Sequence, residues 1–285
     1  ERLGAVARFG LPPFVAWLRN WDYSTAARVD YFVANSPSVA ARIAKYYRRE
    51  CVVIPPPVDT GLFSTSDEQD DAFLIVSRLV PYKRIDLAVR AFTQLGLPLH
   101  IIGGGRDEKR LRHIAGKNVK FLGRLSDEQV RQRMARCQAF IFPGEEDFGL
   151  APVEAQAAGR PVIAYGAGGA LASVVEGATG IFFDEPTPES LAGAVRDFQR
   201  MRFDSAAIRQ HALEFDTAVF SRRFSQLVDS KIALHPVLAR KAGIDYQGPG
   251  VPPLLRRQRA ALEETPPRLR LTPGPRRLRE GTTNS

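Results

Sequence analysis

Two basic side chains follow the first strand that the sequence predicts in its main domain. The apolar run 73–80 predicts a buried strand, and Arg78 and Lys83 stand at its carboxyl end, five residues apart. Ligands of parallel sheets bind at this end of the strands. Because arginine can bind phosphate through two parallel hydrogen bonds and lysine acts as a point charge, this pair could hold a diphosphate. Taken alone, the pair is better explained as two solvated surface cations.

Two carboxylates, Glu146 and Glu154, form the second candidate site and lie eight residues apart. They follow the predicted strand 139–142 and run into a predicted helix at 150–158. Gly149 permits close approach of the backbone to a ligand, and the amides that open the helix attract phosphate. One carboxylate could hold hydroxyls of a sugar and the other those of a ribose. The alternative is a helix with a favourably acidic first turn, which explains Glu146 but not Glu154, since Glu154 lies beyond that turn.

Other motifs that carry chemistry are incomplete or absent. The glycine-rich segment 103–105 does not complete G-x-G-x-x-G and predicts a tight turn, whereas 166–169 predicts a loop that passes close to a ligand, or only a turn. There is no G-x-x-x-x-G-K-[ST], G-x-S-x-G or Asp-x-Asp, and the histidines lack metal-ligand spacing. The sequence therefore favours no metal site. Cys51 and Cys137 are expected to be buried, reduced thiols, as in a cytosolic protein.

The elements that must position these residues follow one another in a regular order. From residue 73 onward, six units of a short apolar run and a helical pattern predict an α/β fold, a Rossmann-like parallel sheet with helices on both faces. The predicted strands are 73–80, 99–102, 119–122, 139–142, 161–165 and 180–183. The predicted helices are 84–95, 107–115, one starting with a capping box at 126–129, 150–158, 170–176 and 188–201.

The residues before 73 predict only two strands, 31–35 and 51–54, and a helix from 36 to 47. That is too little to close a domain. We therefore interpret residues 1–59 as the remnant of a preceding α/β domain with its crossover, and residues 60–236 as the main domain.

Composition and charge separate a tail from the rest of the chain. With 44% hydrophobic and 25% charged residues, the sequence is ordinary for a globular protein, and global disorder is excluded. The net charge is +9, of which +6 falls after residue 239, together with seven of the 21 prolines. Residues 237–285 therefore predict a disordered basic tail. A contact with RNA or an acidic lipid surface is conceivable there, but a solvated tail is the simpler interpretation.

Together, the two constellations resemble the motifs of retaining glycosyltransferase family four, the glycosyl transferases group 1 with a GT-B fold. The segment 76–83 resembles the family's donor-phosphate motif, and 146–154, with its internal Phe-Gly-Leu, resembles its Glu-x7-Glu motif. The segments 35–36 and 53–59 resemble the entry into the second domain, although Pro-Pro stands where many members have Asn-Gly. The resemblance covers about residues 20 to 230, and most of the family's N-terminal acceptor domain is missing. A final family helix is expected at 217–232, with an apolar face left exposed.

The resemblance implies a site and a reaction. By it, Arg78 and Lys83 hold the diphosphate of a nucleotide-sugar, Glu154 holds the ribose, and Glu146 contacts the transferring sugar. Arg78, Lys83 and Glu146 would be the catalytic residues, and no metal or other cofactor is expected. The other donor-binding residues implied are Arg124 and Leu125 near the base, and Phe148, Gly149 and Leu150 near the sugar and phosphate.

Three functions follow from these observations. The first is a hexosyltransferase, or its donor-binding half, that moves a sugar from GDP-mannose or a UDP-sugar to a glycan or lipid-linked acceptor in polysaccharide biosynthesis. The second is a non-catalytic nucleotide-sugar-binding fragment, because the acceptor domain is missing. The third, a basic protein that binds RNA or a membrane surface, depends on the tail alone. The expected location is cytoplasmic, with a peripheral contact at the inner face of the membrane left open and no specific nucleic-acid partner.

Overall fold

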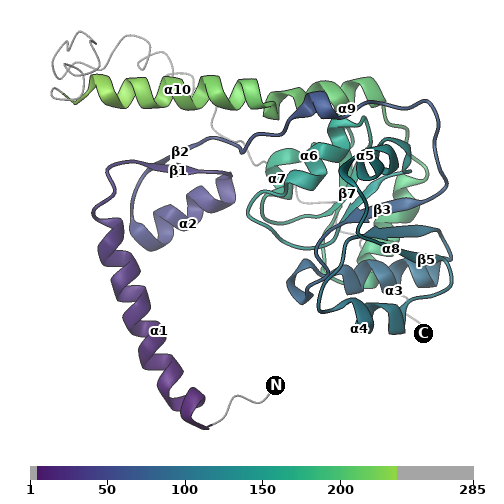
Figure 1. Cartoon of the computed structure of the whole chain (residues 1–285), viewed down its shortest axis with the longest axis horizontal. Coiled ribbons are helices and arrows are strands. Elements are labelled where there is room, and N and C mark those ends of the chain that lie inside the picture. Colours follow the sequence, from purple (N-terminus) through teal and green to yellow (C-terminus); the bar gives the residue numbers. More distant parts are fainter. Residues whose placement is uncertain (1–4, 236–285) are drawn as a thin grey trace, which may run out of the picture. The chain divides into compact units, whose positions relative to one another are not determined.

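A six-stranded parallel sheet forms the centre of the part of the chain that the computed structural model describes, residues 5–235 (Figure 1). Its strands are β3 (Phe73–Val76), β4 (Leu99–Ile102), β5 (Val119–Gly123), β6 (Phe140–Phe142), β7 (Val162–Tyr165) and β8 (Gly180–Phe183). Their spatial order is β5-β4-β3-β6-β7-β8, and every neighbouring pair is parallel. The strand order therefore reverses between β3 and β6, which is where open α/β sheets form a ligand crevice. The six predicted βα units are confirmed.

Helices cover both faces of this sheet, as predicted. They are α3 (Ile85–Leu95), α4 (Glu108–Ile114), α5 (Asp127–Arg136), α6 (Leu150–Ala157), α7 (Ala170–Ser173), α8 (Pro188–Phe198) and α9 (Ser205–Ala212). Successive side chains of a strand point to opposite faces. Accordingly, Phe73 and Ile75 join a buried cluster with α3, α4 and α8, while Leu74 joins a second cluster with α5, α6 and the segment that follows α9. Phe92 and Leu99 are fully buried, and each such side chain contributes about 1.5–3 kcal/mol to folding.

Local sequence signals explain where several helices begin. The Ser126 hydroxyl accepts a hydrogen bond from the Gln129 amide, and the Gln129 side chain accepts one from the Ser126 amide. This reciprocal capping box satisfies amides that a helix N-terminus leaves unpaired, and it confirms the predicted start of α5. At α8, the Thr187 hydroxyl accepts a hydrogen bond from the Ser190 amide, and Pro188 occupies the first turn.

Three predicted elements extend too far along the chain. The strand expected at 73–80 ends at Val76, because the next residues leave the ladder and pair with the glycine segment: the Leu79 amide donates to the Gly104 carbonyl. The helix expected at 170–176 ends at Ser173, since the Glu176 carboxylate accepts a hydrogen bond from the Phe182 amide. The helix expected at 188–201 ends at Phe198.

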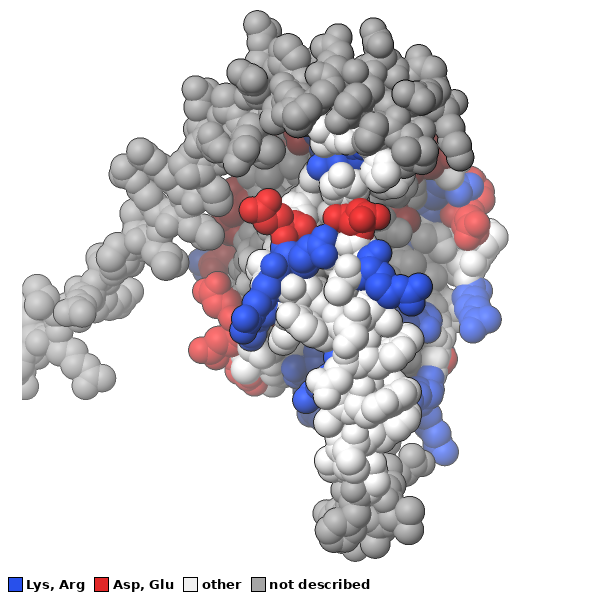
Figure 2. Space-filling view, turned by 90° about the vertical axis from the view of Figure 1, so that its left-hand side faces the viewer, with Lys and Arg blue, Asp and Glu red and all other residues white. Residues whose placement is uncertain are grey.

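The residues before the main sheet form two helices and a small sheet. They are α1 (Ala5–Ala26), β1 (Phe32–Ala34), α2 (Pro37–Tyr47) and β2 (Cys51–Val53), and β1 pairs with β2 in parallel. Helix α1 was not predicted, because its Pro12-Pro13 pair interrupts the helical pattern. Figure 2 shows that the surface of α1 is largely uncharged, and its Trp17 side chain is 59% exposed. Cys51 is only partly buried, so the prediction that both thiols are buried holds for Cys137 alone.

The crossover into the main domain is fastened to the start of the last helix. The Val58 amide donates to the Phe215 carbonyl, the Thr217 amide donates to the Val58 carbonyl, and the Thr60 hydroxyl donates to the Asp216 carboxylate. The last helix, α10, spans Thr217–Ala233 and confirms the one expected at 217–232. Its Phe224 side chain is exposed, as expected for that helix.

By their internal contacts, residues 1–224 and 225–285 form two units, and the boundaries of the three predicted domains stay predictions. The tail predicted at 237–285 lies outside the described residues. Within residues 5–235, no helix is both long and apolar enough to cross a membrane.

Candidate functional site

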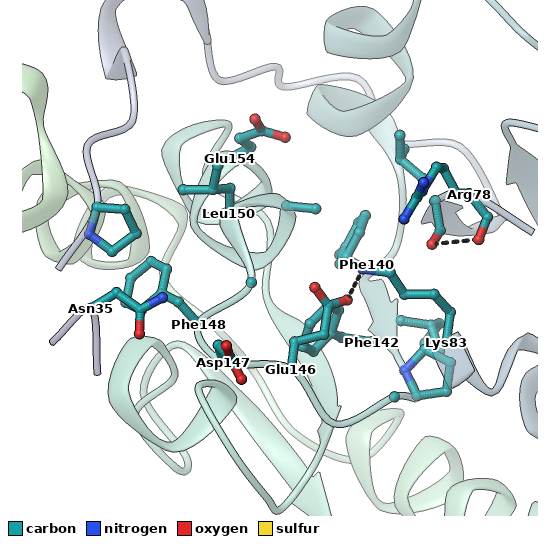
Figure 3. A pocket seen from close by; sticks show the side chains of 18 residues that line it. Asn35, Arg78, Lys83, Phe140, Phe142, Glu146, Asp147, Phe148, Leu150 and Glu154 are labelled. Carbon is teal, nitrogen blue, oxygen red and sulfur yellow. Dashed lines mark hydrogen bonds and ion pairs between the residues drawn. The ribbon is translucent and has the colours of Figure 1, made fainter. Parts of the chain in front are cut away.

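A cavity of about 590 Å³ opens at the carboxyl ends of β3 and β6, where the strand order reverses (Figure 3). Arg78 and Lys83 reach it from the connection between β3 and α3. Glu146 reaches it from the connection between β6 and α6, and Glu154 from the second turn of α6. Because β3 and β6 are neighbours, two segments more than 60 residues apart in sequence face each other across the cavity.

Seven of the nine residues predicted for the site line this cavity. They are Arg78, Lys83, Glu146, Phe148, Gly149, Leu150 and Glu154. Arg124 and Leu125 are not among the lining residues. Arg124 lies beside Gly104, and Leu125 packs against the core cluster on the α5–α6 side of the sheet. The structure therefore gathers the two predicted constellations in one place, whereas a contact of Arg124 and Leu125 with a base stays a prediction.

Opposite charges meet inside the cavity. The Lys83 ammonium donates a hydrogen bond to the Glu146 carboxylate, and the two side chains are only 18% and 20% exposed. Arg78 has no carboxylate partner among the described residues; its guanidinium lies 3.4 Å from the Tyr82 hydroxyl. A ligand that brings negative charge would therefore meet Arg78 directly and would compete with Glu146 for Lys83.

Glu154 lies in a different electrostatic setting from Glu146. Burial raises the pKa of the Glu154 carboxyl, and the nearby negative charge of Asp127 raises that pKa further. Glu154 also borders a second cavity of about 320 Å³, which Asp127 and Arg131 of α5 line from the other side. Because Leu150 and Glu154 line both cavities, the two hollows adjoin at α6. An extended ligand could therefore continue from the cations past Glu154.

The loop that carries Glu146 is held by the glycine segment 166–169. The Gly169 amide donates a hydrogen bond of 2.7 Å to the Glu146 carbonyl. A Cβ atom on Gly169 would collide with the backbone of Phe148, and one on Gly168 with the carbonyl of Glu146, so only glycine permits this contact. The segment was predicted to pass close to a ligand or to form only a turn. The structure shows instead that it passes close to the acidic loop.

The N-terminal segment contributes residues that were not assigned to the site. Asn35, at the end of β1, lines the cavity, and its Oδ1 atom is buried without a hydrogen-bond partner among residues 5–235. The Ser38 hydroxyl donates a hydrogen bond of 3.0 Å to the Gly168 carbonyl, and the Arg42 guanidinium forms an ion pair with Asp147. The sequence separates these pairs by more than 100 residues. Only the Asn-Ser pair at 35–36, noted as part of the domain entry, hinted at this segment.

Within residues 5–235, no group of three or more His, Cys, Asp or Glu side chains could hold a metal ion. The positive charge at the cavity comes from Arg78 and Lys83. That the reaction needs no metal stays a prediction.

A doubly wound parallel sheet with a cation-lined cavity at its reversal is the architecture of nucleotide-binding α/β domains. The sequence profile of the family described as glycosyl transferases group 1 matches residues 63–214. This match covers more than half of the chain, and the chain belongs to that family.

Curated proteins and solved structures agree with this family. A D-inositol 3-phosphate glycosyltransferase of Geodermatophilus obscurus is 28% identical over 255 residues, covering 77% of this chain and 55% of that protein. A GDP-mannose-dependent monoacylated alpha-(1-6)-phosphatidylinositol monomannoside mannosyltransferase of Corynebacterium glutamicum is 33% identical over 176 residues, covering 54% of this chain and 46% of that protein.

Among solved structures, Alr3699/HepE of Anabaena in complex with UDP and glucose superposes with a TM-score of 0.66 at 23% identity, covering 74% of this chain and 66% of that one. This likeness shows a shared GT-B fold. The chain spans about half the length of the curated relatives named here.

Proposed function

We propose that this chain binds a nucleotide-sugar and serves as the donor-binding half of a glycosyltransferase that moves a hexose to a hydroxyl acceptor. The observation that carries the proposal is the cavity at the strand reversal, where Arg78, Lys83, Glu146 and Glu154 face one ligand-sized space. Membership of the glycosyl transferases group 1 supports the same reaction class.

Each residue has a role that its setting suits. Arg78 and Lys83 bind the diphosphate and stabilise the negative charge that develops on it as the bond to the sugar breaks. A contact of this kind to the charge that develops in a transition state lowers the activation barrier by about 3 kcal/mol. The amides of Gly149 and Leu150 open α6 and point their partial positive charge at the same phosphate. Glu154 accepts hydrogen bonds from the ribose hydroxyls, and Glu146 contacts the transferring sugar.

The proposal includes retention of the anomeric configuration and no metal ion. Two side-chain cations and a helix N-terminus can supply the positive charge that a divalent ion would otherwise bring to a diphosphate. The donor is GDP-mannose or a UDP-sugar. In support, the Corynebacterium relative is named as GDP-mannose-dependent, and the Anabaena structure holds UDP and glucose. The acceptor is a glycan or a lipid-linked molecule. A cytoplasmic location, with a peripheral membrane contact left open, completes the proposal.

A second candidate function is donor binding without sugar transfer. The observation that favours it is the span of the chain, which covers about half of the curated relatives' length. Turnover separates the two candidates, since both require the same donor site.

The test is calorimetric titration of the chain with UDP, GDP, UDP-glucose and GDP-mannose in the presence of EDTA, beside an Arg78→Ala/Lys83→Ala double variant. Each charge-assisted contact contributes about 1.5–3 kcal/mol, so the double variant should bind at least about 100-fold more weakly. An Arg106→Ala/Lys109→Ala variant, which removes two cations outside the cavity, is the matched control. If the folded chain binds none of these nucleotides, or if the double variant binds as well as the unmodified chain, the proposed function is wrong.

A further inference from the structure

The glycine segment that follows β4 packs directly against the backbone that carries Arg78. A Cβ atom on Gly105 would lie 2.2 Å from the carbonyl oxygen of Leu79, the residue after Arg78. Hydrogen bonds close the same contact, because the Leu79 amide donates to the Gly104 carbonyl and the Asp107 amide donates to the Leu79 carbonyl. The Leu79 side chain is fully buried in the cluster that the sheet forms with α3, so its backbone has no room to give way.

The residue before Arg78 is held in a similar way. A Cβ atom on Gly103 would lie 1.9 Å from the Ser77 carbonyl oxygen, and the Ser77 amide donates a hydrogen bond of 3.0 Å to the Ile102 carbonyl. Gly103 also takes a φ of 126°, which favours glycine by itself, whereas Gly105 is needed for space alone. The segment was predicted to form a tight turn, and the structure shows that it also supports the backbone on both sides of Arg78.

A single glycine supports the backbone of Lys83 from the neighbouring strand exit. Gly144 lies between β6 and α6, is buried and lines the cavity. A Cβ atom there would lie 2.8 Å from the Lys83 carbonyl oxygen and 3.0 Å from the Lys83 Cα atom, which is closer than van der Waals contact. The next residue, Arg84, has a φ of 52°. A residue other than glycine keeps this left-handed conformation only where its surroundings impose it, so the backbone at Lys83 is tightly constrained.

The exits of β4 and β6 thus set the positions of the two cations independently. In Figure 3, Arg78 and Lys83 enter the cavity from the same side, where both can reach one ligand. Contacts of this kind depend on placement, since a displacement of about 1 Å can cost about 100-fold in activity.

We propose that Gly105 and Gly144 are positioning residues of the diphosphate site, which hold the backbone of Arg78 and Lys83 where both side chains can bind the same diphosphate. The inference rests on the proposed function. It gives the glycine segment after β4 a role in the site, although Gly105 itself is not among the residues that line the cavity.

The test is a double-mutant cycle with Gly144→Ala and Lys83→Ala, followed by calorimetric titration with UDP and GDP. Gly144→Ala should weaken binding by about tenfold when Lys83 is present and by less than about twofold when Lys83 is already alanine. A glycine that served the fold alone would cost the same affinity in both backgrounds. The equivalent cycle of Gly105→Ala with Arg78→Ala should show the same coupling.

Gly116→Ala is the matched control, with melting curves recorded for every variant. Its Cβ atom would lie 2.8 Å from the Asn118 side chain and 2.9 Å from that of Thr93, away from the residues that line the cavity, so nucleotide affinity should change by less than about twofold.

Unchanged affinity in both folded glycine variants, or losses that are equal in both backgrounds, would overturn the inference while leaving the donor site in place. If only one glycine variant folds, its cycle decides; if neither folds, these glycines serve the fold rather than the site, and the inference is overturned. If the Arg78→Ala/Lys83→Ala double variant binds as well as the unmodified chain, the proposed function fails first, and the inference fails with it.

Discussion

Glu146→Gln should tighten the binding of a free nucleoside diphosphate even though Glu146 is proposed to act in sugar transfer. In the structure the Lys83 ammonium is bound to the Glu146 carboxylate. A diphosphate that recruits Lys83 must break this ion pair and place its own negative charge near the carboxylate. The amide of glutamine keeps the shape of the side chain but removes both penalties.

The burial of the pair sets the size of the effect. The two side chains are 18% and 20% exposed, so the pair is neither solvated nor fully desolvated. Two unit charges 4 Å apart attract by about 4 kcal/mol at an effective dielectric constant of about 20, whereas exposed pairs contribute about 0–1 kcal/mol after solvation. Since desolvation offsets part of the attraction in this largely buried setting, the net effect should be about 1–2 kcal/mol, or about 5- to 30-fold in the dissociation constant.

Calorimetric titration with UDP and GDP at low and high salt measures the effect. Asp147→Asn is the matched control, because Asp147 also lines the cavity but pairs with Arg42 and is 62% exposed. That variant should change the affinity by less than about twofold, and high salt should reduce the gain in Glu146→Gln. Equal or weaker diphosphate binding by a folded Glu146→Gln variant would show that the ion pair does not compete with the ligand, and the reasoning would be refuted.

Three further predictions concern titratable groups. Because burial and Asp127 raise the pKa of Glu154, its carboxyl takes up a proton at higher pH than an ordinary glutamate. Nucleotide-sugar affinity should therefore fall as the pH is lowered from neutral, and titrations of Glu154→Gln with the same nucleotide-sugar should show weaker binding without this dependence; an unchanged profile would contradict the ribose contact. Hydrogen bonds from Thr60 and from the Ala218 amide hold the pKa of Asp216 below its ordinary value. The ionised carboxylate therefore stabilises the fold at pH values above the ordinary pKa, and this stabilisation is lost as the pH falls through the lowered pKa. Asp216→Ala should cost about 1 kcal/mol in urea unfolding at neutral pH and less in acid, and an equal cost at both would refute the assignment. Burial raises the pKa of the Cys137 thiol to about 12, so iodoacetamide at mildly alkaline pH should label Cys51 first, which peptide mass spectrometry detects; faster labelling of Cys137 would contradict its burial.

Much of the main domain could be predicted because its signals are local. Continuous apolar runs mark the strands, and the capping box at Ser126 marks the start of α5. Strand exits in a parallel sheet share one edge, so Arg78, Lys83 and Glu146 could be expected on the same side of the molecule. The ion pair between Lys83 and Glu146 could not be predicted, because it requires β3 and β6 to be neighbours, and strand order is set by packing across the whole sheet.

The missed features depend on long-range contacts or on weak local patterns. Asn35 lines the cavity, and Arg42 contacts the loop that carries Glu146. Both lie more than 100 residues before that loop in the sequence, and no neighbouring residue indicates these contacts. Helix α1 contains two adjacent prolines, which ordinarily predict a break. Cys51 lies on β2, in a two-stranded sheet that has too few neighbours to bury its thiol fully. The apolar residues beside it in the sequence therefore led to a prediction of more burial than the structure shows.

The loop that carries Glu146 is held from three directions, and this arrangement joins the fold to the proposed chemistry. Lys83 binds the Glu146 side chain from the exit of β3, Gly169 binds its carbonyl from the exit of β7, and Arg42 binds the adjacent Asp147 from α2. The contacts of Gly169 and Arg42 do not involve Arg78 or Lys83 and can persist when a donor binds, whereas the Lys83 contact lies where the diphosphate is proposed to bind. A donor can therefore exchange one charge pair for another without moving the loop. In the proposed mechanism, a diphosphate that replaces the Glu146 carboxylate at Lys83 would leave that carboxylate free to contact the sugar, so occupation of the phosphate site would be coupled to the role of Glu146.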